Sequence, residues 1–537
     1  MGTPERRAEQ NAPPSFPTRP IAIAVLLLLP GLAARGGSLR VTAYDAEGRL
    51  MDAGALLRHI APAARKETGV PPEESGLYLT DLEGREAPGR PWWVAGSTTP
   101  AWAWEGAERV RVSMPWPVAE DGFSTVSLDG ESQGYGEGQS ILLNEQIALC
   151  AYRHMQESLK ERTTRWEPRY EPGPQTRGLA DRAKNAVAEA RAARARREQA
   201  RLFDKALTEI STAWQHILFE HGRQVLRDPE HGPRLRRGLT LDETVVDRIK
   251  EYDWIAKKVA DAGADWVRLP FRSNPEDFSY ARRNSFNLYD KLVEALVRRK
   301  VRVMGSVLDS MLWPGDVTPD LYRERTSNLV RHFKDRIRSW EIASEPNGTW
   351  LGGAGGPLSD ETVLLSIQRA AVEVKRIDAS LETVATLHWW EGTAPDARHG
   401  LLSWLRWSTP RGFGRGIDVV ALSVYPHRHP LGLAFGPVFR ELHRLFPEKR
   451  LMLGGWSFGD DAKKESPGYW WLKPGTLPRD MQDARKDLVV LFAGSAAAIP
   501  ASVGGGFFWP TLQQMLRPGR KTTSLYRTYK RTLKRLR

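Results

Sequence analysis

The chain has 537 residues, with 41% hydrophobic and 27% charged side chains, which indicates a globular protein of two to four domains. Its formal net charge of +13 favours anionic partners such as acidic polysaccharide, acidic lipid or nucleic acid. The single cysteine, Cys150, excludes an intramolecular disulfide and a cysteine-based metal site. Its apolar neighbours predict a buried, inert thiol.

Residues 1–37 have the pattern of an export signal. An apolar run at 21–32 follows Arg6, Arg7 and Arg19, and small residues come after it. The run is shorter than the roughly 20 residues that span a bilayer. We therefore expect a cleaved signal peptide, with an uncleaved N-terminal anchor as the alternative. Either way the rest of the chain is expected in the periplasm, the cell envelope or outside the cell.

Residues 38–135 are predicted to form a β-rich, sandwich-like module. Polar and apolar residues alternate at 39–44, residues 109–113 form a second strand candidate, and glycine and proline are frequent between them. The module also contains a group of tryptophans, at Trp92, Trp93, Trp102, Trp104 and Trp116. Such residues line a carbohydrate-binding surface or fill the core of a sandwich, and the sequence leaves both interpretations open.

Residues 136–235 are predicted to be a helical connecting segment. The stretch 184–206 is rich in alanine and arginine with interspersed glutamate, which favours an exposed helix. RNA binding by this stretch is disfavoured because no aromatic residues are interleaved for base stacking. The prolines within 167–178 are expected to interrupt the helices.

Residues 236–537 alternate between strand and helix patterns, for example helices at 286–299 and 361–377. The strand candidates are 265–271, 301–308, 337–344, 383–389, 417–425, 450–456 and 505–509, with a weaker one at 237–241. Eight apolar strands with helical crossovers predict an α/β fold, a (β/α)₈ barrel. An open, doubly wound sheet is the alternative, but no glycine fingerprint for a nucleotide follows an early strand. The basic tail, 517–537, is expected to form the last barrel helix, or else to contact an anionic polymer.

Active sites of such barrels lie at the carboxyl ends of the strands, so the residues at these ends are the candidate site. In strand order they are Arg268, Asp309, Ser344, Glu345, Asn347, His388, Trp389, Glu391, Tyr425, Trp456 and Trp509. Acidic, imidazole and aromatic groups on one face suit a polar ligand that also has apolar faces, such as a sugar.

The segment Trp-Glu-Ile-Ala-Ser-Glu-Pro-Asn at 340–347 resembles the Asn-Glu-Pro motif of the clan A glycoside hydrolases, which are (β/α)₈ barrels. The clan includes β-xylosidases, α-iduronidases and cellulase-like endoglycanases. Residues 263–268, 418–425 and 506–509 resemble its second, sixth and eighth strands. The resemblance implies hydrolysis of a polysaccharide or oligosaccharide, with Glu345 as the general acid/base. A carboxyl group in that role works best when burial or a neighbouring charge raises its pKa.

The resemblance also implies substrate-binding roles. Arg268 would hold the charge of the catalytic carboxylates, His388 and Tyr425 would position hydroxyls or a second carboxylate, and Trp509 would stack on the sugar. The other expected substrate-binding residues are Ser344, Asn347, Trp389 and Trp456.

Two positions depart from the clan pattern. Ser344 stands where the clan has an asparagine, and Gly455 stands where it has the glutamate nucleophile. A retaining mechanism needs that second carboxylate at about 5 Å from the first, and an inverting one tolerates about 6.5–9.5 Å. The candidates for a substitute are Asp309, Glu391, Asp460 and Asp461. Otherwise the barrel binds glycans or assists polysaccharide assembly without hydrolysis, or the strand assignment is shifted.

We expect no cofactor and no metal. The sequence contains no phosphate loop. His427, Arg428 and His429 are interpreted as a plain loop, because two histidines at i and i+2 have no third ligand in the sequence.

Overall fold

The computed structural model of the protein describes residues 36–60, 78–83, 87, 92–93, 99–118, 122–391, 394, 398–426, 429–457, 481–509 and 511–536. Residues 1–35 of the predicted export signal, His427, Arg428, Asp460 and Asp461 lie outside the described residues. Arg35–Arg537 form one compact unit.

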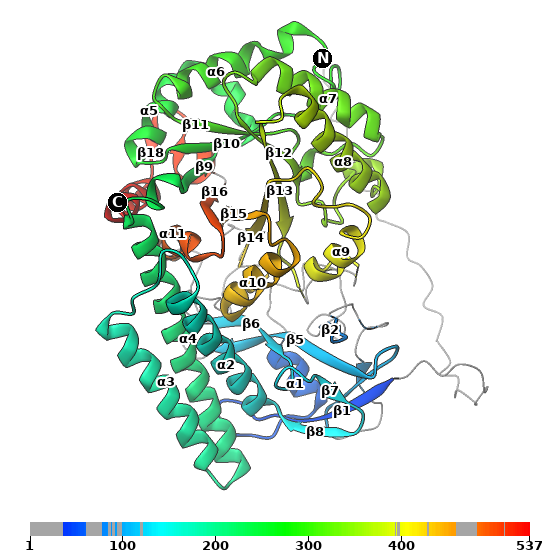
Figure 1. Ribbon diagram of the computed structural model, residues 1–537, viewed down its shortest axis with the longest axis vertical. Helices are drawn as coiled ribbons and strands as arrows, with labels where there is room; N and C mark the ends of the chain where they lie inside the picture. The colour runs from blue at the N-terminus through cyan, green and yellow to red at the C-terminus, as the bar shows by residue number, and fades with distance from the viewer. Residues whose placement is uncertain are drawn as a thin grey trace, which may run out of the picture. The chain divides into compact units, whose positions relative to one another are not determined.

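Eight parallel strands close into a barrel in the order β10-β11-β12-β13-β14-β15-β16-β9 (Figure 1). They are β9 (Arg236–Thr240), β10 (Trp266–Pro270), β11 (Arg302–Ser306), β12 (Ser339–Ser344), β13 (Glu382–His388), β14 (Val419–Val424), β15 (Arg450–Trp456) and β16 (Ser502–Phe508). The predicted (β/α)₈ barrel is confirmed, and the open sheet is wrong because β16 pairs with β9.

The last strand begins three residues before its predicted start at 505. Gly504, Gly505 and Gly506 all have positive φ, of 79°, 106° and 81°. Glycine has no side chain that could show the alternation of a strand, so the sequence does not indicate that these three residues belong to a paired strand.

Helices surround the barrel strands, as α5, α6, α7 and α8 do in Figure 1. They are α5 (Tyr252–Ala262), α6 (Asn287–Val297), α7 (Pro319–Phe333), α8 (Asp360–Ile377), α9 (Leu401–Ser408), α10 (Phe435–Leu445), α11 (Met481–Ser495), the short α12 (Thr511–Gln514) and α13 (Ser524–Leu536). Thr318 and Ser359 cap α7 and α8 through their hydroxyls. The basic tail forms a barrel helix, since α13 packs on α5 and α11. None of the described helices has the length and apolarity needed to cross a membrane.

The amino-terminal half of the barrel interior is filled by packed side chains. A cluster there contains Trp266, Met304, Val384, Val419, Ala421, Met452, Val503 and Phe507. Arg236 stacks over Trp266 with 4.3 Å between its guanidinium carbon and the ring centroid, and pairs with Glu382. The interior of the barrel is therefore a packed core at this end, and barrels of this kind carry their active sites at the carboxyl ends of the strands.

Two small sheets precede the barrel, so the β-rich character of this region is as expected. One has the order β3-β4-β1-β8, and in the other β5 pairs with β2, β6 and β7. Their elements are β1 (Gly37–Thr42), α1 (Ala53–Ile60), β2 (Tyr78–Thr80), β3 (Trp92–Trp93), β4 (Ala101–Trp104), β5 (Arg109–Val118), β6 (Gly122–Leu128), β7 (Tyr135–Gly136) and β8 (Gln139–Leu142). Trp102, Trp104 and Trp116 are buried, which assigns them to the core rather than to a binding surface.

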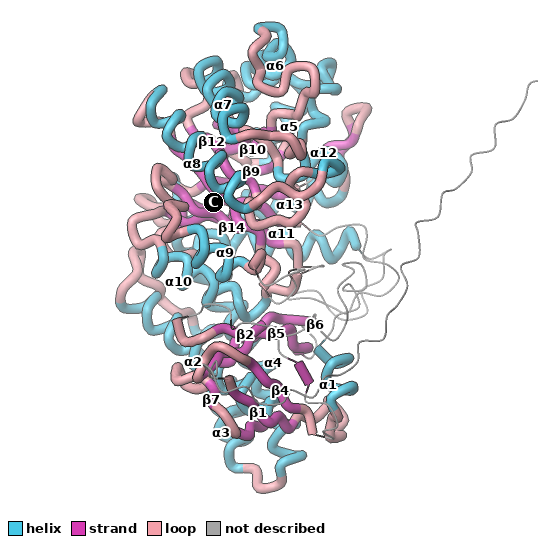
Figure 2. Tube along the Cα trace, turned by 90° about the vertical axis from the view of Figure 1, so that its right-hand side faces the viewer, coloured by secondary structure: helices cyan, strands magenta, loops and turns pink. Residues whose placement is uncertain are grey.

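Three helices connect the sheets to the barrel and lie beside the sheet strands in Figure 2. They are α2 (Leu143–Thr164), α3 (Pro174–Ala192) and α4 (Arg196–Arg227). The single exposed helix predicted for 184–206 is wrong, because the chain leaves the helix at Ala193 and α4 packs along α3. Arginine and alanine favour a helix at every position, so the sequence pattern could not show where the chain turns. Cys150 in α2 is buried, as predicted.

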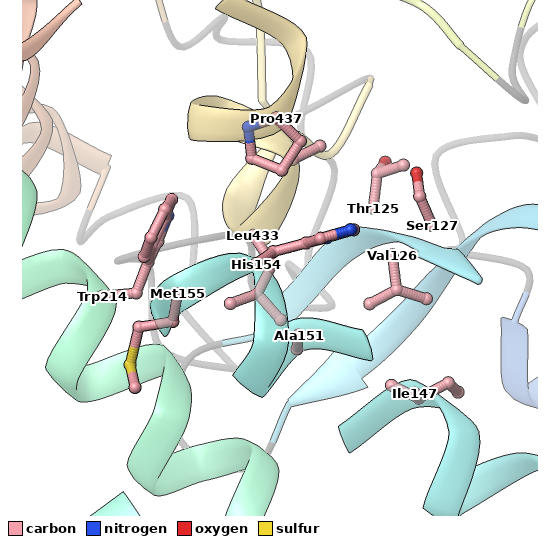
Figure 3. A pocket seen from close by; sticks show the side chains of 11 residues that line it. Thr125, Val126, Ser127, Ile147, Ala151, His154, Met155, Trp214, Leu433 and Pro437 are labelled. Carbon is pink, nitrogen blue, oxygen red and sulfur yellow. The ribbon is translucent and has the colours of Figure 1, made fainter. Parts of the chain in front are cut away.

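The β-rich module contacts the loop that follows β14. The Thr125 hydroxyl donates to the Pro430 carbonyl at 2.5 Å, and the Thr125 amide donates to the Leu431 carbonyl at 3.3 Å. Figure 3 shows the small pocket at this junction, where His154 lies between Leu433 and Val126. Its volume of about 10 Å³ holds at most one water molecule. The module thus supports the barrel loop that also carries Tyr425 and His429.

Candidate active site

Glu345 follows β12 at the carboxyl end of the barrel, where the sequence placed it. Its φ of 47° is left-handed, a conformation that is strained for a non-glycine residue. The side chain is buried, with 9% of its surface exposed. Ser310, after β11, donates to Oε2 at 2.8 Å, and Ser423, on β14, donates to Oε1 at 2.5 Å. His388, on β13, brings Nδ1 to 3.3 Å from Oε1. Three neighbouring strand ends therefore fix this carboxylate.

These contacts set the charge state of Glu345. Burial by itself raises the pKa of a carboxyl group, but electrostatic attraction to His388 and the hydrogen bonds with His388, Ser423 and Ser310 outweigh it. The pKa of Glu345 is lowered to about 2, and not raised as a general acid would need. In the free protein at neutral pH, Glu345 is thus an ionised carboxylate.

Below Glu345, a buried arginine holds two further carboxylates. Arg268 Nη2 lies 2.6 Å from Glu341 Oε2 and 3.0 Å from Asp309 Oδ2, and donates to the Ser344 hydroxyl at 3.1 Å. Thr386 donates to the other oxygen of Glu341 at 2.5 Å. Burial disfavours the charged guanidinium, but Glu341 and Asp309 more than offset it and raise the pKa of Arg268. Arg268 thus holds the charge of Glu341 and Asp309, whereas its expected role towards catalytic carboxylates stays a prediction.

Asp309 differs from Glu345 in its electrostatics. Burial raises the pKa of Asp309, Arg268 opposes this, and the charges of Glu345 and Glu341 add to it. Burial also raises the pKa of the half-buried Glu243, with Asp309 and Arg268 acting on it in opposite directions. The site therefore combines one carboxylate whose pKa is lowered with neighbours, Asp309 and Glu243, whose pKa is raised.

An aromatic wall stands beside Glu345. The His388 ring stacks on Tyr425 with centroids 5.6 Å apart, and makes edge contacts with Trp350, Trp390 and His429 at 5.0, 5.3 and 5.2 Å. The half-buried Trp509 meets Tyr425 edge-on at 6.5 Å. Burial and the charge of Glu345 raise the pKa of Tyr425, so its hydroxyl stays protonated and can donate a hydrogen bond. Flat rings beside polar groups suit a sugar.

Other predicted site residues have structural contacts. The Asn347 amide donates to the carbonyls of His388 and His399 and accepts from the His388 backbone amide at 2.8 Å, so it fastens the end of β13. Trp389 is buried and donates to the Pro430 carbonyl at 3.0 Å.

Trp456 and Glu391 also have contacts of this kind. Trp456 is fully buried, stacked on Phe492 with 5.5 Å between centroids. Glu391 accepts from the Leu402 amide in the first turn of α9 at 3.3 Å. A carboxylate at a helix amino terminus is stabilised there, which is a sufficient reason for its position.

Gly455 lies where the resemblance places the nucleophile, and it pairs with Ser423 across β14 and β15. A Cβ atom built on Gly455 would have its nearest contacts with the Ser423 Cβ and the Tyr425 hydroxyl, both at 3.6 Å. This is ordinary van der Waals distance, and the φ of Gly455 is not left-handed. Room for a side chain therefore exists beside Ser423 and Tyr425, although the chain supplies none.

Sequence reasoning missed several residues of the site, namely Glu243, Ser310, Glu341, Trp350, Thr386, Ser423 and His429. Glu341 stands in the same strand as Glu345, but a bulge between Glu341 and Ala343 decides which side chains turn inward. Ser310 and Ser423 are small hydroxyl residues without a motif. Only the convergence of strands distant in sequence identifies them.

The end of β15 also spells Gly-Trp-Ser-Phe-Gly, a pattern shared with serine hydrolases. The side chain of Ser457 is buried, and within the described residues its hydroxyl has no hydrogen-bond partner. An activated serine nucleophile needs a base that takes its proton, and among the described residues none is hydrogen-bonded to Ser457. Nor does any cluster of three His, Cys, Asp or Glu in the described part of the chain have the arrangement of a metal site.

Solved structures that are similar to this chain include two glycosidases. The chain resembles a family 1 β-glucosidase from Thermotoga maritima, with 13% identity, a TM-score of 0.36, and coverage of 50% of this chain and 78% of that one. It also resembles β-glycosidase BGL167, with 15% identity, a TM-score of 0.37, and coverage of 51% and 86%. The barrel itself is established by the strand pairing. No protein-family model and no curated protein sequence matches the chain.

The neighbouring glycines of β15 provide a test of the space at Gly455. A Cβ on Gly454 would come within 2.8 Å of Thr386 and 2.9 Å of Ala421, inside the packed barrel. We expect Gly454→Ala to lower the free energy of unfolding by about 1–3 kcal/mol. Gly455→Ala should change it by less than about 1 kcal/mol, because its Cβ fits. Denaturant unfolding of both variants measures the difference, and equal losses would show that the space is absent.

The pKa of Glu345 predicts how stability depends on pH. Since folding lowers this pKa from an ordinary 4.5 to about 2, the ionised side chain stabilises the fold above about pH 4.5, and this contribution is lost as pH falls towards 2. The stability gap between the wild type and Glu345→Gln should therefore be widest near pH 7 and should narrow between pH 5 and 3. Urea unfolding at several pH values measures it. A gap that stays constant would contradict the lowered pKa.

Proposed function

We propose that this protein is a glycoside-hydrolase-like barrel that acts on an extracellular or cell-envelope polysaccharide at the Glu345 site. The observation that carries the proposal is the state of Glu345 itself. A buried carboxylate on a strained backbone is costly to keep, and side chains from three neighbouring strand ends hold it at the barrel mouth. Strain retained at such a position is typical of a functional group.

The chemistry follows from the charges. Glu345 takes a proton from an attacking water molecule once a bound substrate displaces the donors that lower its pKa. The leaving oxygen takes a proton from a carboxyl group whose pKa burial raises, and Asp309 fills this role when it parts from Arg268 and holds a proton. This is the single-displacement route, which needs no carboxylate on the seventh strand. For Glu345 to act instead as the acid, a bound substrate would first have to displace Ser310 and Ser423 from its oxygens.

A second candidate function is glycan binding without hydrolysis, in polysaccharide assembly or export. The observation that favours it is Gly455, which leaves the position of the nucleophile empty beside Tyr425. In that case the aromatic wall and the Arg268 network serve only to hold the sugar.

Hydrolysis separates the two functions. A panel of aryl glycosides and polysaccharides is incubated with the wild type, and released sugar is measured together with its anomeric form by NMR. We expect release with inversion, reduced by a factor of about 10²–10⁴ in Glu345→Gln, because removal of an acid/base group has this effect. The variant should still bind the glycan, since the aromatic wall is unchanged.

Two outcomes contradict the leading function. Equal release by the wild type and Glu345→Gln would show that Glu345 takes no part in the chemistry. Binding on a glycan array without release from any substrate would favour the second candidate. Trp509→Ala is the complementary variant. We expect it to weaken binding of the same glycan, because Trp509 contacts Tyr425 edge-on and adds its ring to the aromatic wall.

We also propose that the protein is exported, on the strength of the basic flank and apolar run within residues 1–37. The full chain expressed in bacteria should appear in the envelope or periplasmic fraction, with a new amino terminus near residue 37 by protein sequencing. Leu27→Arg places a charge in the apolar run and should retain the protein inside the cell. An uncut chain in the membrane fraction would identify the segment as an anchor, and an uncut chain in the cytoplasm would refute export.

A further inference from the structure

A second cleft lies at the opposite end of the barrel from Glu345. It has a volume of about 670 Å³ and opens where β15 and β16 begin, at Arg450 and Ser502. The loop after α2, with Arg165 and Trp166, forms one wall, and Arg234 and His443 also line it. Nothing in the proposed function uses this end of the barrel, because the Glu345 site lies at the carboxyl ends of the strands.

A buried positive charge lies directly behind the wall of this cleft. Arg162 has 1% of its surface exposed. Its guanidinium donates to the Ser158 hydroxyl at 2.9 Å and to the Ala498 carbonyl at 2.8 Å, lies 2.7 Å from His221 Nδ1, and stacks over Trp166 at 4.2 Å. All these partners are neutral, and no described carboxylate forms an ion pair with Arg162.

Burial, with Arg440 nearby, lowers the pKa of Arg162 to about 9, which leaves it charged at neutral pH. A buried charge without a counterion is costly, and an anion close by reduces the cost. The unneutralised guanidinium therefore makes the cleft attractive to anions.

The lining of the cleft adds further cations. Arg165 is exposed and forms no ion pair with a described residue. Arg234 and Arg450 are largely exposed and pair with Glu230 at 3.3 Å and with Glu382 at 2.7 Å. The Arg234–Glu230 pair is exposed on both sides and therefore weak, so Arg234 can turn to a ligand. Arg450 is held by the mostly buried Glu382 through one nitrogen, and its other N–H groups can donate to a ligand. Among the lining residues the one carboxylate is Glu167, which leaves an excess of positive charge.

Two more groups of the lining suit a ring-shaped ligand. Trp166 brings an aromatic ring to the wall, and sugar rings pack well against such surfaces. His443 lines the cleft, and within the described residues its Nδ1 is buried without a hydrogen-bond partner.

We propose that this cleft is a second, independent binding site for an acidic saccharide. Its carboxylate or sulfate is held by Arg165, Arg234 and Arg450, and its sugar ring lies against Trp166. Arginine suits this task because its planar fork forms paired hydrogen bonds to carboxylate and sulfate oxygens. The site lets the protein remain attached to an anionic polymer while the barrel mouth is free.

The test measures binding by titration calorimetry with the full chain. Tetragalacturonate and a heparin tetrasaccharide are the acidic probes, the methyl ester of tetragalacturonate is the uncharged match, and inorganic sulfate is the simple anion. We expect at least one acidic probe to bind at least tenfold more tightly than the ester and than sulfate. Arg165→Gln with Arg450→Gln should weaken it by about tenfold or more. Arg299→Gln, at an exposed position outside the cleft, is the control and should change nothing.

The outcomes are distinct. Binding that survives Glu345→Gln but is lost in the double arginine variant supports the proposal, even if no hydrolysis is found. Loss of binding in Glu345→Gln would place the ligand at the barrel mouth and overturn it. If inorganic sulfate binds as tightly as the acidic saccharides, the cleft binds simple anions only, and the proposal of a saccharide site is overturned. Absence of binding by both acidic probes, or equal binding of the ester, would also overturn it.

Discussion

The structure depends on the closure of the barrel between its first and last strands, β9 and β16. Residues more than 260 positions apart must pair there, and β16 must also fit against β15. Glycine makes this approach feasible. A Cβ on Gly504 would lie 2.8 Å from the Arg236 backbone, and one on Gly505 would lie 2.3 Å from the Leu453 carbonyl, while both residues have left-handed φ. Only a closed barrel brings the carboxyl ends of β10 to β16 to one mouth, and the Glu345 site is made of those ends.

At the carboxyl end of the barrel, buried charged groups set the proton affinity of each carboxylate. Arg268 is a single fixed cation among Asp309, Glu341 and Glu345, and pairs directly with the first two. Glu345 obtains its stabilisation elsewhere, from Ser310, Ser423 and His388. Carboxylates within one small volume therefore have different affinities for protons. This separation arises from which neighbour donates to which oxygen.

The two ends of the barrel differ in charge as well as in shape. The mouth gathers carboxylates and aromatic rings, whereas the cleft at the amino-terminal ends gathers arginines around the buried Arg162. The helices before the barrel contribute to this arrangement, since Arg162 ends α2 and His221 lies in α4. The net charge of +13 is thus not only a scattered surface property. Part of it is concentrated in one cleft.

The sequence by itself determined the barrel, seven of its eight strands to within a few residues, and the positions of Glu345 and Arg268. Strand periodicity and chain order carry that information, because each apolar run reports on its own burial. It did not determine the start of β16, the turn at Ala193, or the contacts of Asn347 and Trp456, since these depend on neighbours distant in the chain. Nor could it show that Glu345 is ionised. The pKa of a buried carboxyl group is set by the donors that surround it, and here Ser310, His388 and Ser423 meet only in the closed barrel.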